Sequence, residues 1–462
     1  MLEEADILNE DFMRRAIELA KKGTGLVSPN PLVGCVIVKD NHIIAEGWHE
    51  RCGGFHAERN ALLSCTEDVT GAEMYVTLEP CCHTGKTPPC TDIIIERGIG
   101  KVYVGSDDPN PLVAGHGIEL LRESGITVET GVLKDECDAL NDIFFHYITT
   151  KLPYVAMKYA MTLDGKIAMY SEKKHSSGMD ELDSATPRKR RRAEDMYQAE
   201  RLLVTGPEAN AHVHSLRKAY RAILVGVGTV INDDPMLNYR GEDAGGSDVI
   251  SGGVVSGGAA AGGAVSGGDS SAAGLTGTPD LFENASFDPI RIVLDSHLRI
   301  PLTSQIVKTA STIPTIIACS EDAFDMEADT SLADASMSAS TKKRMLTEAG
   351  ARVIILPLEK SADTDDSILQ SRKTDRKISI AALFEKLGES GIDSVLVEGG
   401  LKVHSSLFLH PELVNRVYAY VSPKLIGKGL PPIDSVAAPL ELADSELIRL
   451  GKDMCLTGRI KH

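Results

Sequence analysis

Apolar and polar positions along the first 150 residues repeat with two different periods. Phe12, Ala16, Leu19 and Ala20 recur at helical spacing, and Gly23 can end that helix. The remaining patterns predict strands at 33–38, 43–47, 74–78 and 101–105, and helices from about 56, after residue 89, and over 115–124 and 134–149. Strands that alternate with helices predict a layered α/β/α domain, with helices on both faces of the sheet.

Short apolar runs predict a second α/β domain from Pro153 onward. They cover residues 154–160, 222–227, 290–295, 315–318, 353–356, 394–398 and 416–421. Polar or glycine-rich stretches interrupt them at about 171–200, 242–286, 322–342 and 359–377. These stretches carry too few bulky apolar residues to offset the entropy cost of ordering, so we predict flexible surface insertions. The predicted domains are therefore 1–150 and 151–462.

Composition narrows the class of partner. The chain has 462 residues, 42% of them hydrophobic, and a formal net charge of −18. That charge disfavours nucleic-acid phosphates and favours a small-molecule substrate. The basic run at 188–192 has no aromatic residues interleaved with it, which favours a solvated insertion over a nucleic-acid contact.

The lack of a recognisable targeting signal and the use of cysteines both predict a cytoplasmic protein. No run of about 18 apolar residues is present to span a membrane. The acidic N-terminus lacks the pattern of a secretion signal. Nine cysteines in no regular framework indicate a reducing compartment, where cysteines serve metals or cores.

The clearest chemical pattern joins one histidine, one glutamate and two cysteines. His56-Ala57-Glu58 is followed by Cys81 and, after eight intervening residues, by Cys90. An imidazole and two thiolates can bind zinc and leave a fourth position to water, whose pKa then falls to about 7. Glu58 can take a proton from that water and give one to a departing nitrogen. The arrangement is that of zinc nucleobase deaminases, with a longer cysteine spacing.

Two other interpretations of these residues are core packing and a structural zinc site with Cys82 as fourth ligand. A structural site takes four protein ligands and does not need an acid two residues from the histidine. Adjacent cysteines would also form an awkward chelate. The pattern therefore favours one catalytic zinc per chain, bound by His56, Cys81 and Cys90.

Four segments together resemble the bifunctional deaminase/reductase family of riboflavin biosynthesis. They are residues 30–34, 56–58, 79–90 and 108–111. The resemblance implies a cytidine-deaminase-like N-terminal domain that acts on 2,5-diamino-6-ribosylamino-4(3H)-pyrimidinone 5′-phosphate. It places substrate contacts on Asn30, His49, His83 and Lys86. These types suit the task, because a lysine can bind a phosphate and the others can donate to ring or sugar oxygens.

The second half alone indicates only an α/β domain with possible phosphate sites. Gly226-Val227-Gly228-Thr229 follows a predicted strand but lacks the third glycine of a dinucleotide fingerprint. Glu398-Gly399-Gly400 also follows a strand, and a helix after it would present free N–H groups to a phosphate. A plain turn explains the same residues equally well.

The resemblance to the same family extends over this half and implies a dihydrofolate-reductase-like fold. NADPH would then reduce the ribosyl side chain to ribityl. Lys158 matches a lysine near the reacting sugar, and Arg217, Leu237, Arg240 and Glu398 match substrate contacts. The positions that match cofactor contacts are Ala160, Leu203, Thr229, Asp233, Ser296, Gly400, Leu401, Lys402, Val403, His404, Ser405 and Ser406.

One departure from the family lies at Leu203, where the family usually carries a tryptophan. Leucine can neither stack as an indole does nor donate a hydrogen bond, and the only tryptophan of the chain is Trp48. Two alternatives to the bifunctional enzyme remain: a deaminase whose reductase domain is impaired or non-catalytic, and a nucleic-acid base deaminase. We expect a homo-oligomer in either case.

Overall fold

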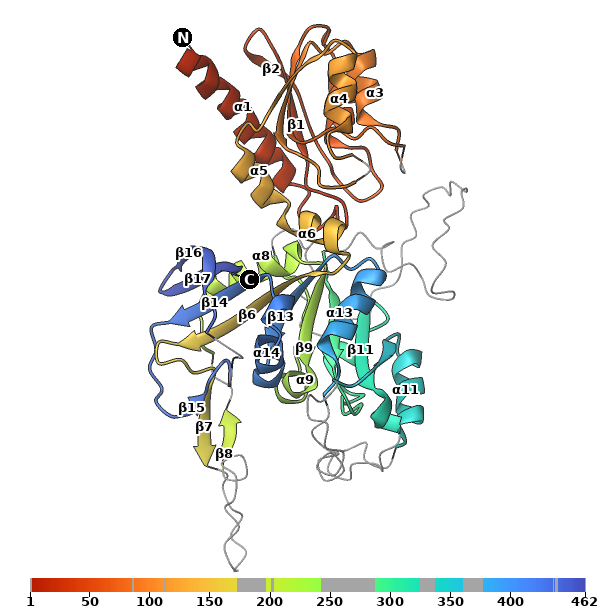
Figure 1. Ribbon diagram of the computed structural model, residues 1–462. Coiled ribbons are helices and arrows are strands. Elements are labelled where there is room, and N and C mark those ends of the chain that lie inside the picture. Colours follow the sequence, from red (N-terminus) through yellow and green to blue (C-terminus); the bar gives the residue numbers. More distant parts are fainter. Residues whose placement is uncertain are drawn as a thin grey trace, which may run out of the picture.

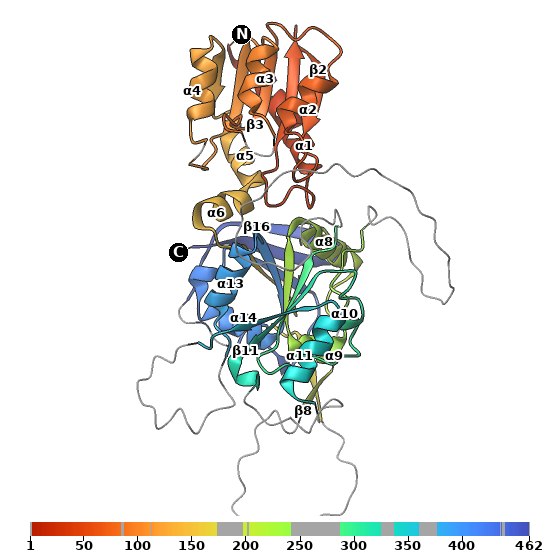
Figure 2. The same ribbon diagram turned by 90° about the vertical axis from the view of Figure 1, so that its right-hand side faces the viewer.

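The computed structural model describes residues 2–84, 87–111, 113–172, 197–200, 203–241, 287–324, 337–359, 377–434, 436 and 439–461. Two layered α/β bodies follow one another along the chain, and helix α6 (Asp142–Thr150) lies between them (Figures 1 and 2).

The N-terminal body is built on a five-stranded sheet of order β2-β1-β3-β4-β5. Its first three strands pair antiparallel, and β3, β4 and β5 pair parallel. The strands are β1 (Gly34–Lys39), β2 (His42–Trp48), β3 (Glu73–Leu78), β4 (Lys101–Ser106) and β5 (Thr127–Thr130). The short edge strand β5 is not predicted by the sequence pattern, because only one of its four residues is buried.

Helices cover both faces of this sheet. On one face, α1 (Leu2–Lys21) and α5 (Lys134–Leu140) pack against a core that contains Met13, Leu19 and Tyr75. On the other face lie α2 (Ala57–Ser64), α3 (Cys90–Glu96) and α4 (His116–Glu123), over a core that contains Leu62 and Ile94 (Figure 2). The predicted three-layer α/β/α domain is confirmed.

The single helix predicted over 134–149 is wrong, because Asn141 divides it into α5 and α6. The Asn141 side chain accepts a hydrogen bond from the Leu32 N–H (2.8 Å) and donates one to the Leu32 carbonyl (3.0 Å). When an asparagine side chain hydrogen-bonds the backbone N–H and carbonyl of another segment in this way, the chain bends at that residue and the helix does not continue through it.

The C-terminal body contains a nine-stranded sheet of order β12-β11-β10-β9-β13-β6-β14-β17-β16. All neighbours from β12 to β14 are parallel, and β17 and β16 are antiparallel. The strands are β6 (Tyr154–Thr162), β9 (Ala222–Gly226), β10 (Ile290–Leu294), β11 (Thr315–Ser320), β12 (Arg352–Leu356), β13 (Ser394–Gly399), β14 (Arg416–Ser422), β16 (Leu442–Leu450) and β17 (Asp453–Ile460). The hairpin β16–β17 is absent from the sequence prediction, since β16 is a largely exposed edge strand without an apolar run.

Helices also cover both faces of the large sheet. Val213 and Leu346 belong to the core on one face, and Leu383 and Leu407 to the core on the other. The helices are α8 (Pro207–Ala219), α9 (Val227–Asp233), α10 (Gln305–Lys308), α11 (Ala339–Glu348), α13 (Ile380–Glu389) and α14 (Leu401–Phe408), with short 3₁₀ turns at Glu321–Phe324 and Pro411–Leu413. The predicted second α/β domain is confirmed.

Two predicted insertions extend less far than the sequence suggested. Strands β7 (Ala168–Glu172) and β8 (Tyr197–Glu200) pair with each other, and β15 (Gly429–Leu430) pairs with β7, so both ends of the 171–200 stretch are strands. The 322–342 stretch already includes the first turn of α11, where the Lys342 side chain is buried. The 242–286 stretch and most of the 359–377 stretch lie outside the described residues.

Hydrogen bonds and ion pairs join the two bodies. Ser28 Oγ donates to Asp393 Oδ2 at 2.7 Å, and the Tyr147 hydroxyl donates to the Gly388 carbonyl at 3.1 Å. An ion pair at 3.6 Å links Arg416 to Asp142 of α6. The N-terminal body is therefore fixed to the α13–β13 corner of the large sheet.

Candidate active sites

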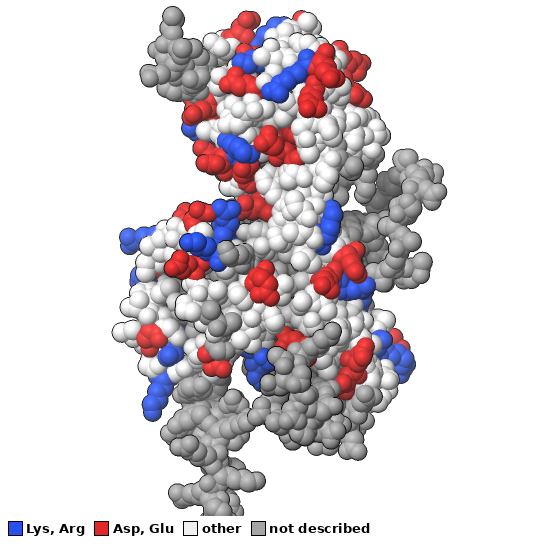
Figure 3. Space-filling model, in the orientation of Figure 1, with Lys and Arg blue, Asp and Glu red and all other residues white. Residues whose placement is uncertain are grey.

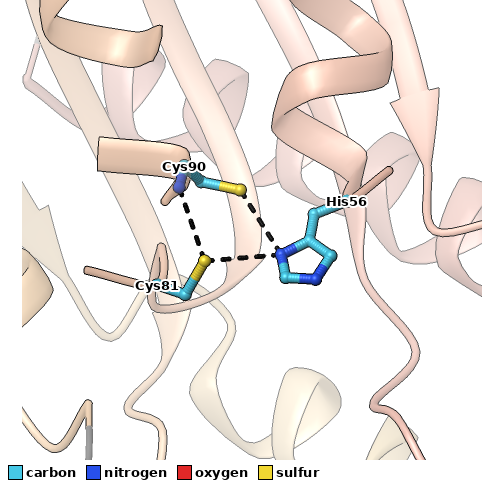
Figure 4. A group of neighbouring side chains, drawn as sticks. All are labelled: His56, Cys81 and Cys90. Atoms are coloured by element: carbon cyan, nitrogen blue, oxygen red, sulfur yellow. Dashed lines mark hydrogen bonds between the residues drawn. The ribbon is translucent and has the colours of Figure 1, made fainter. Parts of the chain in front are cut away.

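A group of three metal-ligand side chains lies where two helices begin. His56 precedes α2, Cys81 follows β3, and Cys90 opens α3. Their ligand atoms lie within 4.8 Å of one another, and His56 Nδ1 is 3.4 Å from each sulfur (Figure 4). Tetrahedral zinc with ordinary Zn–N and Zn–S bonds needs about 3.5 Å between these atoms. The three side chains therefore fit zinc.

Electrostatics also favours a metal at this group. The hydrogen bonds from Cys90 and His56 lower the pKa of the Cys81 thiol, and the same contact with Cys81 raises the pKa of the Cys90 thiol, so the pair favours a thiolate at Cys81. A thiolate is the form that binds metal. Among the described residues, the group comprises His56, Cys81 and Cys90 and does not include Cys82. Three protein ligands are typical of a catalytic zinc.

Glu58 lies beside this group on the first turn of α2. Its side chain is buried, and burial raises the pKa of the carboxyl to about 7. A carboxyl that changes protonation near neutral pH is suited to accept and return a proton.

A cavity of about 330 Å³ opens in front of the cysteine–histidine group. Asn30, His49 and His83 line it, together with Glu58 and Asp108. Asn30, His49 and His83 are three of the four residues that the sequence predicted as substrate contacts, and the fourth, Lys86, lies outside the described residues. Burial raises the pKa of Asp108, which the sequence reasoning did not single out, to about 6.

The wall formed by Asn30 and His49 has a defined hydrogen-bond direction. His49 Nδ1 is 2.9 Å from the Phe55 carbonyl and must donate to it. Its Nε2 is therefore the acceptor for the Asn30 amide nitrogen at 3.1 Å, which points the Asn30 carbonyl oxygen away from His49. Burial lowers the pKa of His49, so the neutral ring is favoured.

Glu79 organises the loop that carries Cys81, and the sequence reasoning assigned it no role. Its buried carboxylate accepts hydrogen bonds from the backbone N–H groups of Gly115 and Gly117, each at 3.0 Å, at the start of α4. A carboxylate at a helix N-terminus is stabilised by the helix dipole. The sequence signal that could have identified Glu79 is the position of an acidic residue directly after a buried strand and two residues before the proposed ligand Cys81.

A second polar cluster lies in the C-terminal body around Lys158 of β6 and Glu398 of β13. Arg217 of α8 donates from Nε to Glu398 Oε1 at 2.6 Å and from Nη2 to Oε2 at 2.8 Å. Burial lowers the pKa of Lys158, and the Glu398 charge partly offsets this effect. The Lys158 ammonium lies 5.6 Å from the centre of the Tyr420 ring. The structure thus brings together three of the predicted reductase residues.

The other two predicted substrate residues lie in the segment after α9. Arg240 is exposed and donates from Nε to Asn238 Oδ1 at 3.1 Å, and Leu237 is buried. The Arg217 Nη1 group also donates to the Asn238 carbonyl at 3.2 Å, so this segment borders the Lys158–Glu398 cluster.

Three of the predicted cofactor residues lie at one edge of the large sheet. Thr229 is on α9 after β9, Ser296 follows β10, and Gly400 follows β13, so all three stand at carboxyl ends of neighbouring parallel strands. Such an edge is where open α/β sheets bind ligands. A Cβ on Gly400 would lie 3.3 Å from Thr229 Oγ1, so these two segments approach closely.

The remaining predicted cofactor residues are spread around that edge. Ala160 is on β6, Asp233 ends α9 with an exposed side chain, and residues 401–406 form most of α14. Leu203 is 73% exposed, and its carbonyl accepts a hydrogen bond from the Lys424 ammonium at 2.7 Å.

Comparisons with known families match the two bodies of the structure separately. The model of the cytidine and deoxycytidylate deaminase zinc-binding region matches residues 7–106, and that of the RibD C-terminal domain matches residues 153–456. The riboflavin biosynthesis protein RibD of Actinobacillus pleuropneumoniae is 42% identical over 96% of this chain and 94% of its own length. The chain belongs to the RibD family.

Solved RibD structures share the fold over nearly the whole chain. Acinetobacter baumannii RibD is 28% identical with a TM-score of 0.67, over 99% of this chain and 100% of that one. The Thermotoga maritima deaminase/reductase is 32% identical with a TM-score of 0.65, over 98% and 99% of the two chains.

Family membership establishes a bifunctional enzyme of riboflavin biosynthesis that acts on a small molecule. Its zinc-binding deaminase region and its RibD reductase domain use Zn²⁺ and NADPH. Within the part of the chain that the structure describes, no helix is both long and apolar enough to cross a bilayer.

Proposed function

We propose that residues 1–150 deaminate 2,5-diamino-6-ribosylamino-4(3H)-pyrimidinone 5′-phosphate, and that residues 151–462 then reduce its ribosyl side chain to ribityl. The product would be 5-amino-6-ribitylaminouracil 5′-phosphate. The observation that carries this proposal is the cavity in which Glu58, Asn30 and His49 face the group of His56, Cys81 and Cys90. The Thermotoga maritima relative is named for the same pair of reactions, as a diaminohydroxyphosphoribosylaminopyrimidine deaminase and 5-amino-6-(5-phosphoribosylamino)uracil reductase.

In the deaminase site, His56, Cys81 and Cys90 would hold the zinc, which when bound would supply an activated water. Glu58 would act as the proton carrier, accepting a proton when water adds to the ring carbon and delivering one to the 2-amino nitrogen as the carbon–nitrogen bond breaks and ammonia leaves. Asn30, His49 and His83 orient the ring and sugar from the cavity wall, and Lys86 binds the phosphate.

In the reductase site, NADPH when bound would supply a hydride to C1′ of the sugar, which must first open to its imine form so that the carbon–nitrogen double bond can accept it. Lys158, held among Glu398, Arg217 and Tyr420, would provide the positive charge near that carbon. Arg240 would bind the phosphate, because three nitrogens of Arg217 already donate to Glu398 and Asn238. Leu237 would border the substrate. The residues that would hold the cofactor at the carboxyl edge of the sheet are Ala160, Leu203, Thr229, Asp233, Ser296 and the 400–406 segment.

Surface charge supports a small substrate. Acidic and basic side chains are interspersed on the face shown in Figure 3, and the whole chain carries a net charge of −18. We accordingly propose that nucleic acid is not a substrate. We also propose a cytoplasmic location and a homo-oligomeric state.

One coupled assay tests both reactions. Purified protein given the diamino pyrimidine nucleotide should release one equivalent of ammonia and then oxidise one equivalent of NADPH. Ammonia release without NADPH oxidation would mean that the C-terminal body does not catalyse. Ammonia release from transfer RNA instead of the free nucleotide would contradict the proposed substrate.

A further inference from the structure

Two segments of the deaminase cavity wall are bonded to the reductase body. Pro29, Asn30 and Pro31 line the cavity, and Ser28 directly before them donates its hydroxyl to Asp393 Oδ2 at 2.7 Å. Tyr147 of α6 also lines the cavity, and its hydroxyl donates to the Gly388 carbonyl at 3.1 Å. Both acceptors belong to one corner of the large sheet, between α13 and β13.

This corner is firmly held within the reductase body. Asp393 is buried, its Oδ1 accepts a hydrogen bond from the Ser394 hydroxyl at 2.8 Å, and its carbonyl accepts one from the Tyr154 N–H at 2.7 Å. Gly388 packs so closely that a Cβ there would lie 2.1 Å from the Lys151 carbonyl oxygen. Packed and hydrogen-bonded in this way, the corner is a rigid acceptor for both segments.

The hydrogen bond from Ser28 to Asp393 helps to fix the position of Asn30. The Asn30 N–H donates to the Val27 carbonyl at 2.8 Å, so the turn from 27 to 30 is a closed unit. Prolines on both sides of Asn30 restrict its backbone. Ser28 attaches this turn to Asp393, and the Asn30 amide attaches it to His49 at 3.1 Å. The turn is thereby held between the cavity wall and the other body.

We propose that the reductase body completes the deaminase substrate site, with Ser28 and Tyr147 as positioning residues that hold the cavity wall against Asp393 and Gly388. This inference rests on the proposed role of Asn30 as a substrate contact. It assigns the second body a task in the first reaction that is separate from its own catalysis.

The test uses full-length Ser28→Ala and Tyr147→Phe enzymes. Ser28→Ala removes only the hydroxyl, and Tyr147→Phe keeps the ring that lines the cavity. Each should raise the KM of deamination about threefold to tenfold, the range expected for one lost buried hydrogen bond. The kcat of deamination, the zinc content and NADPH oxidation with added deaminated substrate should stay at the wild-type level.

Two matched variants separate positioning from general damage. Ser28→Thr keeps a hydroxyl before Pro29 and should restore the wild-type KM. Thr24→Val removes a hydroxyl that donates to the carbonyl of Lys21, the last residue of α1, at 2.7 Å, and should leave the KM unchanged. An unchanged KM in both Ser28→Ala and Tyr147→Phe would overturn the proposal. So would zinc loss together with a lower kcat, or an equal effect of Thr24→Val.

Amide hydrogen exchange gives a measurement that does not depend on turnover. The Asn30 N–H should exchange faster in Ser28→Ala than in the wild type, and Thr24→Val should not show this change. If the wild-type chain fails to deaminate the proposed nucleotide, the proposed substrate is wrong, and the exchange data still decide whether Asp393 holds the wall. Unchanged exchange at Asn30 would contradict the inference.

Discussion

Arg217 and Glu398 form a two-point ion pair across the reductase body, from helix α8 to the end of strand β13. The nitrogen–oxygen distances are 2.6 and 2.8 Å, and little of either side chain is exposed. Although burial alone raises the pKa of a carboxyl, Arg217 outweighs that effect and holds the pKa of Glu398 below its usual value. Glu398 is therefore a fixed negative charge beside Lys158.

Replacing Glu398 with Gln should impair reduction and spare deamination. The change removes the charge that favours the ammonium form of Lys158 and leaves Arg217 buried without its counter-ion. We expect the kcat/KM for NADPH-dependent reduction to fall at least about tenfold, since one to two kcal/mol of electrostatic stabilisation is lost. Ammonia release by the same preparation is the internal control, and an equal fall in both activities would argue against a local role.

Replacing Glu58 with Gln should abolish deamination without loss of metal. Glutamine has the shape of glutamate but cannot accept and return a proton, and general acid–base catalysis contributes about 100-fold to 10,000-fold to a rate. Ammonia release and zinc content per chain are the measurements. Near-normal ammonia release by Glu58→Gln enzyme would show that another group moves the proton.

Chelation of zinc should separate the two activities. His56, Cys81 and Cys90 all lie in the N-terminal body, and the Lys158–Glu398 cluster belongs to the other sheet. After dialysis against a chelator, ammonia release should be lost and should return when Zn²⁺ is added. NADPH oxidation with added deaminated substrate should persist throughout. Loss of both activities would mean that the metal also stabilises the reductase body.

The sequence predicts the zinc group well because its ligands are locally encoded. His56 directly precedes α2 and Glu58 lies on its first turn, while Cys81 follows β3 and Cys90 opens α3. A single strand–loop–helix unit therefore brings two of the three ligands together, and the period of the apolar residues is enough to predict that unit.

Contacts between distant segments could not be predicted in this way. Ser28 and Asp393 are 365 positions apart, and neither stands in a recognisable pattern. Asn141 looks like an ordinary helix residue until its amide is seen to bind the Leu32 backbone. In the β16–β17 hairpin the exposed polar strand β16 pairs with β17, and β17 pairs with β14, a strand that comes from another part of the chain. Such features follow from tertiary packing and not from local propensity.

Acid should destabilise the reductase body through His404. This side chain is buried on α14 beside Tyr159, and burial lowers the pKa of its imidazole to about 4, with carbonyls of Pro432 and Val397 partly offsetting the effect. The nearby Lys158 charge lowers it further. Because an unfolded histidine has a pKa of about 6.5, the folded state binds fewer protons between these values. The free energy of unfolding should therefore fall as the pH drops from about 6.5 to 4, by at most about 3 kcal/mol from this group.

Urea unfolding of wild-type and His404→Gln protein at pH 7.5 and pH 5 measures this contribution. Other groups titrate in the same range, but they are common to both proteins, so the difference between the two pH dependences isolates His404. His404→Gln should lose less stability on acidification than the wild type. His42→Gln, which removes an exposed imidazole from β2, is the matched control and should follow the wild type. Parallel pH dependences for His404→Gln and wild type would mean that the His404 ring is protonated in the folded protein at pH 5, and that the α14 segment opens enough to admit water.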